Sequence, residues 1–157
     1  MNYIDPWLTD YDYRRIEVAT SFPFLVDIAL EVIARHNKSS TPVIQVCGPM
    51  ASGGGKLEEN TLKIAQAITT LRNEGKNVFS QVPFQRGMLN FTTVEDYLRN
   101  PLELLNGFYG PLFRGGHIQA LAFVAGWESS FGCRWEHDTG RALGMDISFL
   151  SDQGMPS

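Results

Sequence analysis

The residues best suited to chemistry lie close together between Trp127 and His137. The segment before them, Ala120 to Ala125, is small or apolar, carries no charge and ends at Gly126. Such a segment is typical of a parallel strand that is buried on both faces. Because ligands bind beyond the carboxyl ends of parallel strands, we expect a ligand site at the polar elbow from Trp127 to Gly132.

Glu136, Ser130 and Glu128 are the side chains of this region that could act on a ligand. We expect a helix from Trp135 to Leu143, ended by Gly144, which places Glu136 within the first turn or so. The helix dipole favours a charged carboxylate there. Ser130 and the free N–H groups of the first turn could bind a phosphate or sugar oxygen. Glu128 is either a proton donor or an exposed loop carboxylate.

Cysteine and histidine offer a competing chemistry. Cys133 and His137 are four residues apart, hence neighbours on a helix face, and could form a nucleophile pair. The alternative is that Cys133 is a small buried residue without chemistry. The three histidines and two cysteines of the chain show no spacing typical of zinc ligands, so we expect no metal and no other cofactor.

The elements that must position these residues alternate between strands and helices. Apolar residues from Phe24 onward recur with helical spacing, and a second such pattern begins at Leu57 and ends at Gly75. Short apolar or alternating runs predict strands at residues 43–48, 77–82, 120–125 and 145–150. A strand, a helix and a strand in this order form a right-handed crossover, so the predicted fold class is α/β with a parallel sheet of about four strands.

Three other regions are less regular. Met1 to Thr20 has no clear period, and we expect it to be irregular. Thr92 or Thr93 can cap a short helix through Leu98. The aromatic and glycine-rich stretch from Phe108 to Gly116 is either a mobile flap near the ligand or an ordinary surface connection.

The glycine-rich run from Met50 to Lys56 resembles a phosphate loop but does not fit that motif. Counting back from Lys56, the first motif glycine would have to be Met50, and the hydroxyl after the lysine would have to be Leu57. The run is therefore either a flexible loop or a loop that lends backbone N–H groups to a ligand.

Length and composition indicate a single domain. The 157 residues comprise an N-terminal extension with one amphipathic helix (1–42), a core (43–150) and a tail (151–157). The formal net charge of -4 argues against binding to a nucleic-acid polymer. The sequence shows no secretory signal, no membrane-span length and no disulfide framework, so we expect a cytoplasmic protein that does not contact membranes.

Four motifs together resemble one known family. They are Cys47-Gly48-Pro49-Met50, the helix end Leu71–Gly75, the strand Val78–Pro83 and the run Gly126–Glu136, which reads GWESSFGCRWE. In this order and spacing they resemble the nucleoside 2-deoxyribosyltransferase-like superfamily, in particular a small branch with C/AGPM and GWxxSxGAxxE motifs. The resemblance spans roughly Val43 to Leu150.

This resemblance implies a flavodoxin-like α/β/α sandwich that forms a homodimer or larger homo-oligomer and binds a nucleoside or nucleoside monophosphate. It further implies action on the N-glycosidic bond, as a hydrolase or a deoxyribosyltransferase, with Glu136 as the nucleophile at the anomeric carbon. The residues expected to bind the substrate are Gly48, Pro49, Met50, Trp127, Ser130 and Gly132.

One departure from the family concerns the proton that the leaving base requires. Relatives with established chemistry usually carry an aspartate just before the third strand, whereas this chain has Gln119 there and His117 two residues earlier. Glutamine cannot act as an acid. Either His117 or Glu128 supplies the proton, a water molecule does, or the protein is a non-catalytic nucleotide-binding module of the same fold.

Overall fold

The computed structural model describes residues 4–38, 40–50 and 57–151. Its sheet has four parallel strands, β1 (Val43–Cys47), β2 (Asn77–Phe79), β3 (Ala120–Phe123) and β4 (Asp146–Phe149), in the spatial order β2-β1-β3-β4. Ile44 of β1 lies opposite both Val78 of β2 and Ala120 of β3, which fixes the register of β2, β1 and β3. The α/β class and the parallel sheet are therefore confirmed.

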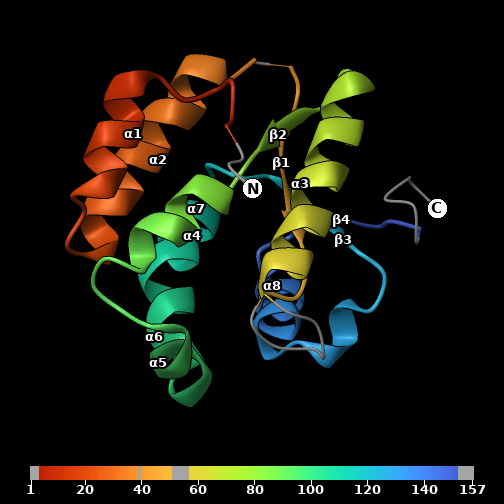
Figure 1. Cartoon of the computed structure of the whole chain (residues 1–157). Coiled ribbons are helices and arrows are strands. Elements are labelled where there is room, and N and C mark those ends of the chain that lie inside the picture. The colour runs from red at the N-terminus through yellow and green to blue at the C-terminus, as the bar shows by residue number, and fades with distance from the viewer. Residues whose placement is uncertain (1–3, 39, 51–56, 152–157) are drawn as a thin grey trace.

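Helices cover both faces of the sheet and complete a flavodoxin-like three-layer sandwich (Figure 1). The helices are α1 (Asp10–Glu17), α2 (Phe22–His36), α3 (Leu57–Asn73), α4 (Val82–Met88), α5 (Val94–Arg99), α6 (Pro101–Leu104), η1 (Leu105–Tyr109), α7 (Gly110–Arg114), η2 (Trp127–Ser129) and α8 (Phe131–Ala142). The buried side chains of α3 pack with Val46, Val78 and Ala122 on one face. Side chains of α1, α2, α4, η1, α7 and α8 are buried with Cys47, Phe79 and Phe123 on the opposite face.

The second strand is shorter than the sequence predicts. It ends at Phe79, and α4 begins at Val82 with Pro83 in its first turn. A proline is well accommodated there because the first N–H groups of a helix have no partner within the helix. Pro83 therefore starts a helix rather than closing a strand.

The helix α8 begins four residues earlier than predicted. Ser130 is its N-cap and accepts a hydrogen bond from the Cys133 N–H over 3.3 Å. Gly132 lies in its first turn, and the low helix propensity of glycine conceals this start in the sequence. Glu136 consequently lies in the second turn of the helix, farther from the dipole's positive end than expected.

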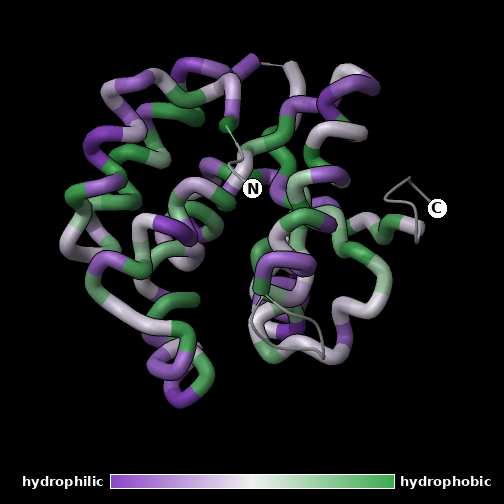
Figure 2. Tube along the Cα trace, viewed as in Figure 1, coloured by the Kyte–Doolittle hydropathy of each residue, from purple (hydrophilic) through white to green (hydrophobic). Residues whose placement is uncertain are grey.

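The N-terminal extension contains two helices instead of one. The segment expected to be irregular forms α1, which begins with a capping box in which Thr9 and Asp12 each bond the other's backbone N–H. Asp12 is buried and forms ion pairs with Arg15 of α1 and Arg35 of α2. The pair with Arg35 stabilises the packing of α1 against α2. Figure 2 shows hydrophilic residues along the outer sides of these two helices.

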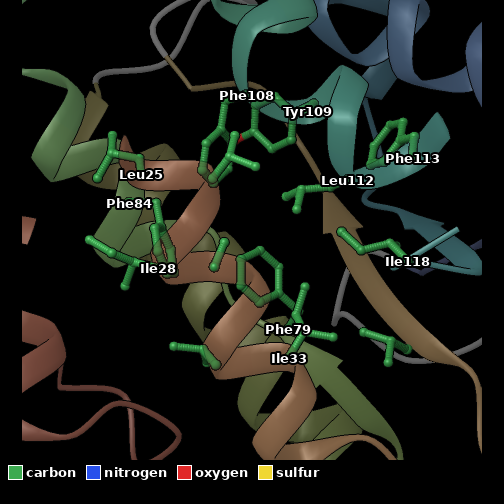
Figure 3. Close-up of a cluster of buried hydrophobic side chains, with 14 of the residues drawn as sticks. Leu25, Ile28, Ile33, Phe79, Phe84, Phe108, Tyr109, Leu112, Phe113 and Ile118 are labelled. Atoms are coloured by element: carbon green, nitrogen blue, oxygen red, sulfur yellow. The ribbon is translucent and has the colours of Figure 1, made fainter. Parts of the chain in front are cut away.

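The stretch from Phe108 to Gly116 is neither a flap nor a surface connection for most of its length. It continues η1 into α7, and Phe108 and Leu112 are fully buried. Figure 3 shows both residues in a cluster with Leu25 and Ile28 of α2 and with Phe84 of α4. Aromatic side chains need this burial, so the stretch belongs to the core.

None of the helices in the described part of the chain has the length and apolar composition needed to span a bilayer.

Candidate functional site

A cavity of about 520 Å³ opens at the carboxyl end of β1. Its wall combines Gly48 and Met50, which follow β1, with residues from α3, α4, α5, η1 and α8. Most of the wall is apolar, and a few polar side chains converge on it. This is the composition expected of a small-molecule site in a protein with a parallel sheet.

Glu136 is the buried carboxyl group of this wall, with only 6% of its surface exposed. Gln45 Nε2 donates a hydrogen bond of 2.6 Å to Glu136 Oε2, and the Cys47 thiol donates a second. Burial outweighs both bonds and raises the pKa of Glu136 from 4.5 to about 8. The expectation that the helix dipole keeps this group charged is therefore wrong for the unliganded protein near pH 7, because desolvation dominates.

The start of α8 approaches the cavity closely. Ser130 is 2% exposed, and both Ser130 and Gly132 line the cavity. A Cβ atom on Gly132 would lie 2.5 Å from the Tyr97 hydroxyl oxygen. Glycine allows α8 to pack closely against Tyr97, which also lines the cavity.

The structure thus brings together five of the residues expected from the sequence, namely Gly48, Met50, Ser130, Gly132 and Glu136. Pro49 is half-buried and lies outside the wall. The rest of the glycine-rich run, residues 51–56, lies outside the described residues.

Trp127 and Glu128 do not face the cavity. Trp127 stacks on His137 with ring centroids 4.8 Å apart and on Phe149 at 5.8 Å, so it is a packing residue rather than a platform for a base. Glu128 is exposed on η2, and its backbone carbonyl accepts a hydrogen bond from Arg134. Trp127 of η2 packs against Phe149 of β4, and Glu128 is not part of the cavity wall.

His117 and Gln119 lie at the opposite end of the sheet. Both precede β3, whereas the cavity opens beyond the carboxyl ends of the parallel strands. Gln119 has a structural role there, because its Oε1 accepts a hydrogen bond of 2.7 Å from the Val43 N–H. His117 is exposed and cannot donate a proton to a ligand at Glu136.

The competing pair of Cys133 and His137 is not assembled. Burial, followed by the nearby charge of Glu136, raises the pKa of the Cys133 thiol, which disfavours the reactive thiolate. His137 Nδ1 lies 3.2 Å from an oxygen of Asp138, and its ring stacks on Trp127. Within the described residues, no group of three histidine, cysteine, aspartate or glutamate side chains is arranged to hold a metal ion.

Two glutamines and two tyrosines that the sequence motifs do not single out also line the cavity, namely Gln81, Gln85, Tyr97 and Tyr109. Gln85 Nε2 donates to the Tyr109 hydroxyl over 2.7 Å, and Gln81 Nε2 donates to the Val46 carbonyl over 2.7 Å. Burial, and then the charge of Glu136, raises the pKa of Tyr97 to about 12. The sequence contains one indication of a buried polar partner near the site, namely Gln45, the single amide in the otherwise apolar strand VIQVC.

A guanidinium group suits bidentate contact with a 5′-phosphate, and two arginines of the chain, Arg86 and Arg114, differ in their position relative to the cavity. Arg86 lines the cavity, whereas Arg114 donates to Asn106 Oδ1 over 3.4 Å and lies above the Trp135 ring. Only the former is placed to meet a ligand at Glu136.

The fold and the site define a flavodoxin-like α/β protein with a buried carboxyl group in a largely apolar cavity. Comparison with known proteins assigns no family to it: no protein-family model, no curated protein and no solved structure matches the chain.

Proposed function

We propose that the protein cleaves the N-glycosidic bond of a nucleoside or nucleoside monophosphate, with Glu136 as the nucleophile. The observation that carries the proposal is the position of Glu136: buried, held by Gln45 and part of the wall of a cavity of about 520 Å³. Glycoside cleavage by retention requires a carboxylate beside the anomeric carbon. The resemblance of the GWESSFGCRWE run to the deoxyribosyltransferase-like superfamily supports the same role.

The reaction proceeds in two displacements. A carboxylate oxygen of Glu136 bonds to the anomeric carbon as the bond to the base nitrogen breaks, and the base leaves with the bonding electrons and takes up a proton. Water, or an N–H nitrogen of a second base, then bonds to the anomeric carbon and displaces the Glu136 carboxylate, and the proton that it loses returns to the group that protonated the leaving base. With water as the acceptor the protein is a hydrolase, and with a second base as the acceptor it is a deoxyribosyltransferase.

Glu136 must be ionised to act as the nucleophile. With its pKa raised to about 8 by burial, the charged form is the minor one at pH 7 in the unliganded protein. The positive charge that develops on the sugar favours ionisation at the moment of reaction.

The proton for the leaving base has two proposed sources. Glu58, exposed at the start of α3, is the other carboxyl group among the described wall residues. A water molecule in the cavity is the second source. Neither His117 nor Glu128 belongs to the described wall, so both are set aside.

The alternative function is a non-catalytic nucleotide-binding module. It is favoured by the raised pKa of Glu136 and by the exposed position of Glu58, because a site that lacks an ionised nucleophile and a buried acid could bind without reacting.

Incubation of the purified protein with a panel of ribonucleosides, deoxynucleosides and their 5′-monophosphates, followed by chromatography of the free base, separates the two functions. We expect base release that Glu136→Gln abolishes and that the exposed Glu128→Gln leaves unchanged. Loss of release in Glu58→Gln assigns the proton to Glu58, and retention assigns it to water. Tight binding without release from any panel member supports the binding module instead.

Release with water alone indicates a hydrolase, whereas dependence on an added acceptor base indicates a transferase. The family resemblance also leads us to propose a homodimer or larger assembly, which light scattering of the purified chain tests directly.

A further inference from the structure

We infer that Gln81 and Gln85 select the base, and that the preferred base carries an exocyclic amino group. This inference rests on the proposed function and adds a substrate class to it. Both residues belong to α4 or its N-cap, are one helical turn apart and line the cavity.

The two side-chain oxygens lack donors. Gln81 is 2% exposed and Gln85 is 8% exposed, and the Oε1 atom of each has no hydrogen-bond partner among the described residues. A buried acceptor without a partner is costly, and most buried polar groups in proteins are paired. Both residues form part of the cavity wall, so a small rotation of each side chain would turn its oxygen toward a molecule in the cavity that supplies the missing donor.

The orientation of the Gln81 amide is set by its neighbour. Its Nε2 donates to the Val46 carbonyl, which can only accept, so the amide cannot be reversed without opposing two oxygens. Its Oε1 is therefore an obligate acceptor. Gln85 Nε2 donates to the Tyr109 hydroxyl, and in this orientation the Gln85 Oε1 is a second acceptor one turn along the helix.

The surroundings match a flat heterocycle better than a sugar. Val82, Met88 and Leu89, from α4 and its C-cap, line the same cavity with apolar groups, whereas Glu136 and Ser130 approach it from α8. With the sugar at Glu136, the base lies toward α4. An apolar wall with two acceptors favours a base whose edge offers N–H donors, and an exocyclic amino group supplies two.

Calorimetric titration with matched deoxynucleosides tests this assignment. The pairs are 2′-deoxyadenosine with purine 2′-deoxyriboside, 2′-deoxyguanosine with 2′-deoxyinosine, and 2′-deoxycytidine with 2′-deoxyuridine. We expect the amino member of a pair to bind about tenfold more tightly, since the analogue leaves an acceptor unpaired. The Gln81→Met variant should lose this preference, whereas Gln66→Met, an exposed glutamine on α3, should keep it.

The comparison within each pair uses the unaltered protein, so it holds even if a variant folds poorly. Equal affinities in all pairs, or tighter binding of the members without an amino group, would overturn the base selection while leaving base release, and thus the proposed function, intact. Failure to bind any nucleoside or to release any base would overturn the proposed function and this inference together.

Discussion

Gln45 and Glu136 are 91 residues apart in the chain and meet through a hydrogen bond of 2.6 Å between Gln45 Nε2 and Glu136 Oε2. Gln45 points from β1 toward α8, and the Glu136 that it bonds lines the cavity. Both side chains are buried, so this bond forms where water cannot compete with it. It fixes the orientation of the proposed nucleophile and favours its charged form.

Loss of this bond should make Glu136 harder to ionise. In Gln45→Met, which keeps the length of the side chain, we expect the pKa of Glu136 to rise by about one unit, because a hydrogen bond to a charged group is lost. The pH profile of kcat/KM for base release measures the shift. A profile that keeps its midpoint while the variant remains folded would show that Gln45 does not act on the carboxylate.

Activity should depend on pH in a direction that reveals the role of Glu136. A nucleophile works only when ionised, so base release should rise with pH and reach half its maximum near the pKa of about 8. A general acid works only when protonated, and its rate would fall over the same range. A falling profile would therefore reassign Glu136 from nucleophile to acid.

Protein stability should also follow the ionisation of Glu136. The pKa of Glu136 is about 8 in the folded protein and near the ordinary 4.5 in the unfolded protein. Between pH 4.5 and 8, Glu136 is therefore protonated in the folded state and ionised in the unfolded state. Stability from this group is complete below pH 4.5 and falls as the pH rises to about 8. Glu136→Gln should remove that loss and stabilise the protein by about 1–3 kcal/mol at pH 8.

Urea unfolding at pH 5, 7 and 8.5 measures this effect, with the exposed Glu74→Gln as the matched control. The control should keep the pH dependence of the parent. If the stability of Glu136→Gln depends on pH as strongly as that of the parent protein, Glu136 does not cause the loss of stability at high pH.

Gly132 should control access to the cavity rather than stability. Its substitution by alanine places a Cβ atom 2.5 Å from the Tyr97 hydroxyl oxygen. Tyr97 can move away from the new methyl group because it belongs to α5, a short helix in which none of the six residues is buried. We expect Gly132→Ala to change the free energy of unfolding by about 1 kcal/mol or less and to raise KM.

The double variant Gly132→Ala/Tyr97→Phe removes the hydroxyl that the new methyl group meets, so it should restore KM. If the double variant shows the same KM as Gly132→Ala, the contact with Tyr97 is not what narrows the cavity.

The regular elements were predictable because apolar spacing is a local signal. The four strands and the helices from Phe22 and Leu57 follow from it, with errors at the ends where Pro83 and Gly132 lie in the first turns of helices. The missed helix α1 had a readable signal, the capping box of Thr9 and Asp12.

The site was only half predictable. Motif residues such as Ser130 and Glu136 follow β3 directly, so local sequence places them at its carboxyl end. Gln45, Gln81 and Gln85 come from other elements, and only the folded arrangement brings Gln45 to Glu136 and the other two into the same cavity wall. The raised pKa of Glu136 likewise depends on burial by residues distant in sequence, which opposed the local influence of the helix dipole.

The most direct test of the central claim is to trap the sugar on Glu136. Nucleosides with a 2′-deoxy-2′-fluoro-arabinosyl group and each of the common bases slow both displacements, and intact-mass spectrometry with peptide mapping locates any adduct. We predict one fluorosugar bound to the peptide that contains Glu136, release of one equivalent of base, and no adduct in Glu136→Gln. Base release from the parent protein without an adduct, or an adduct that persists in Glu136→Gln, would contradict Glu136 as the nucleophile.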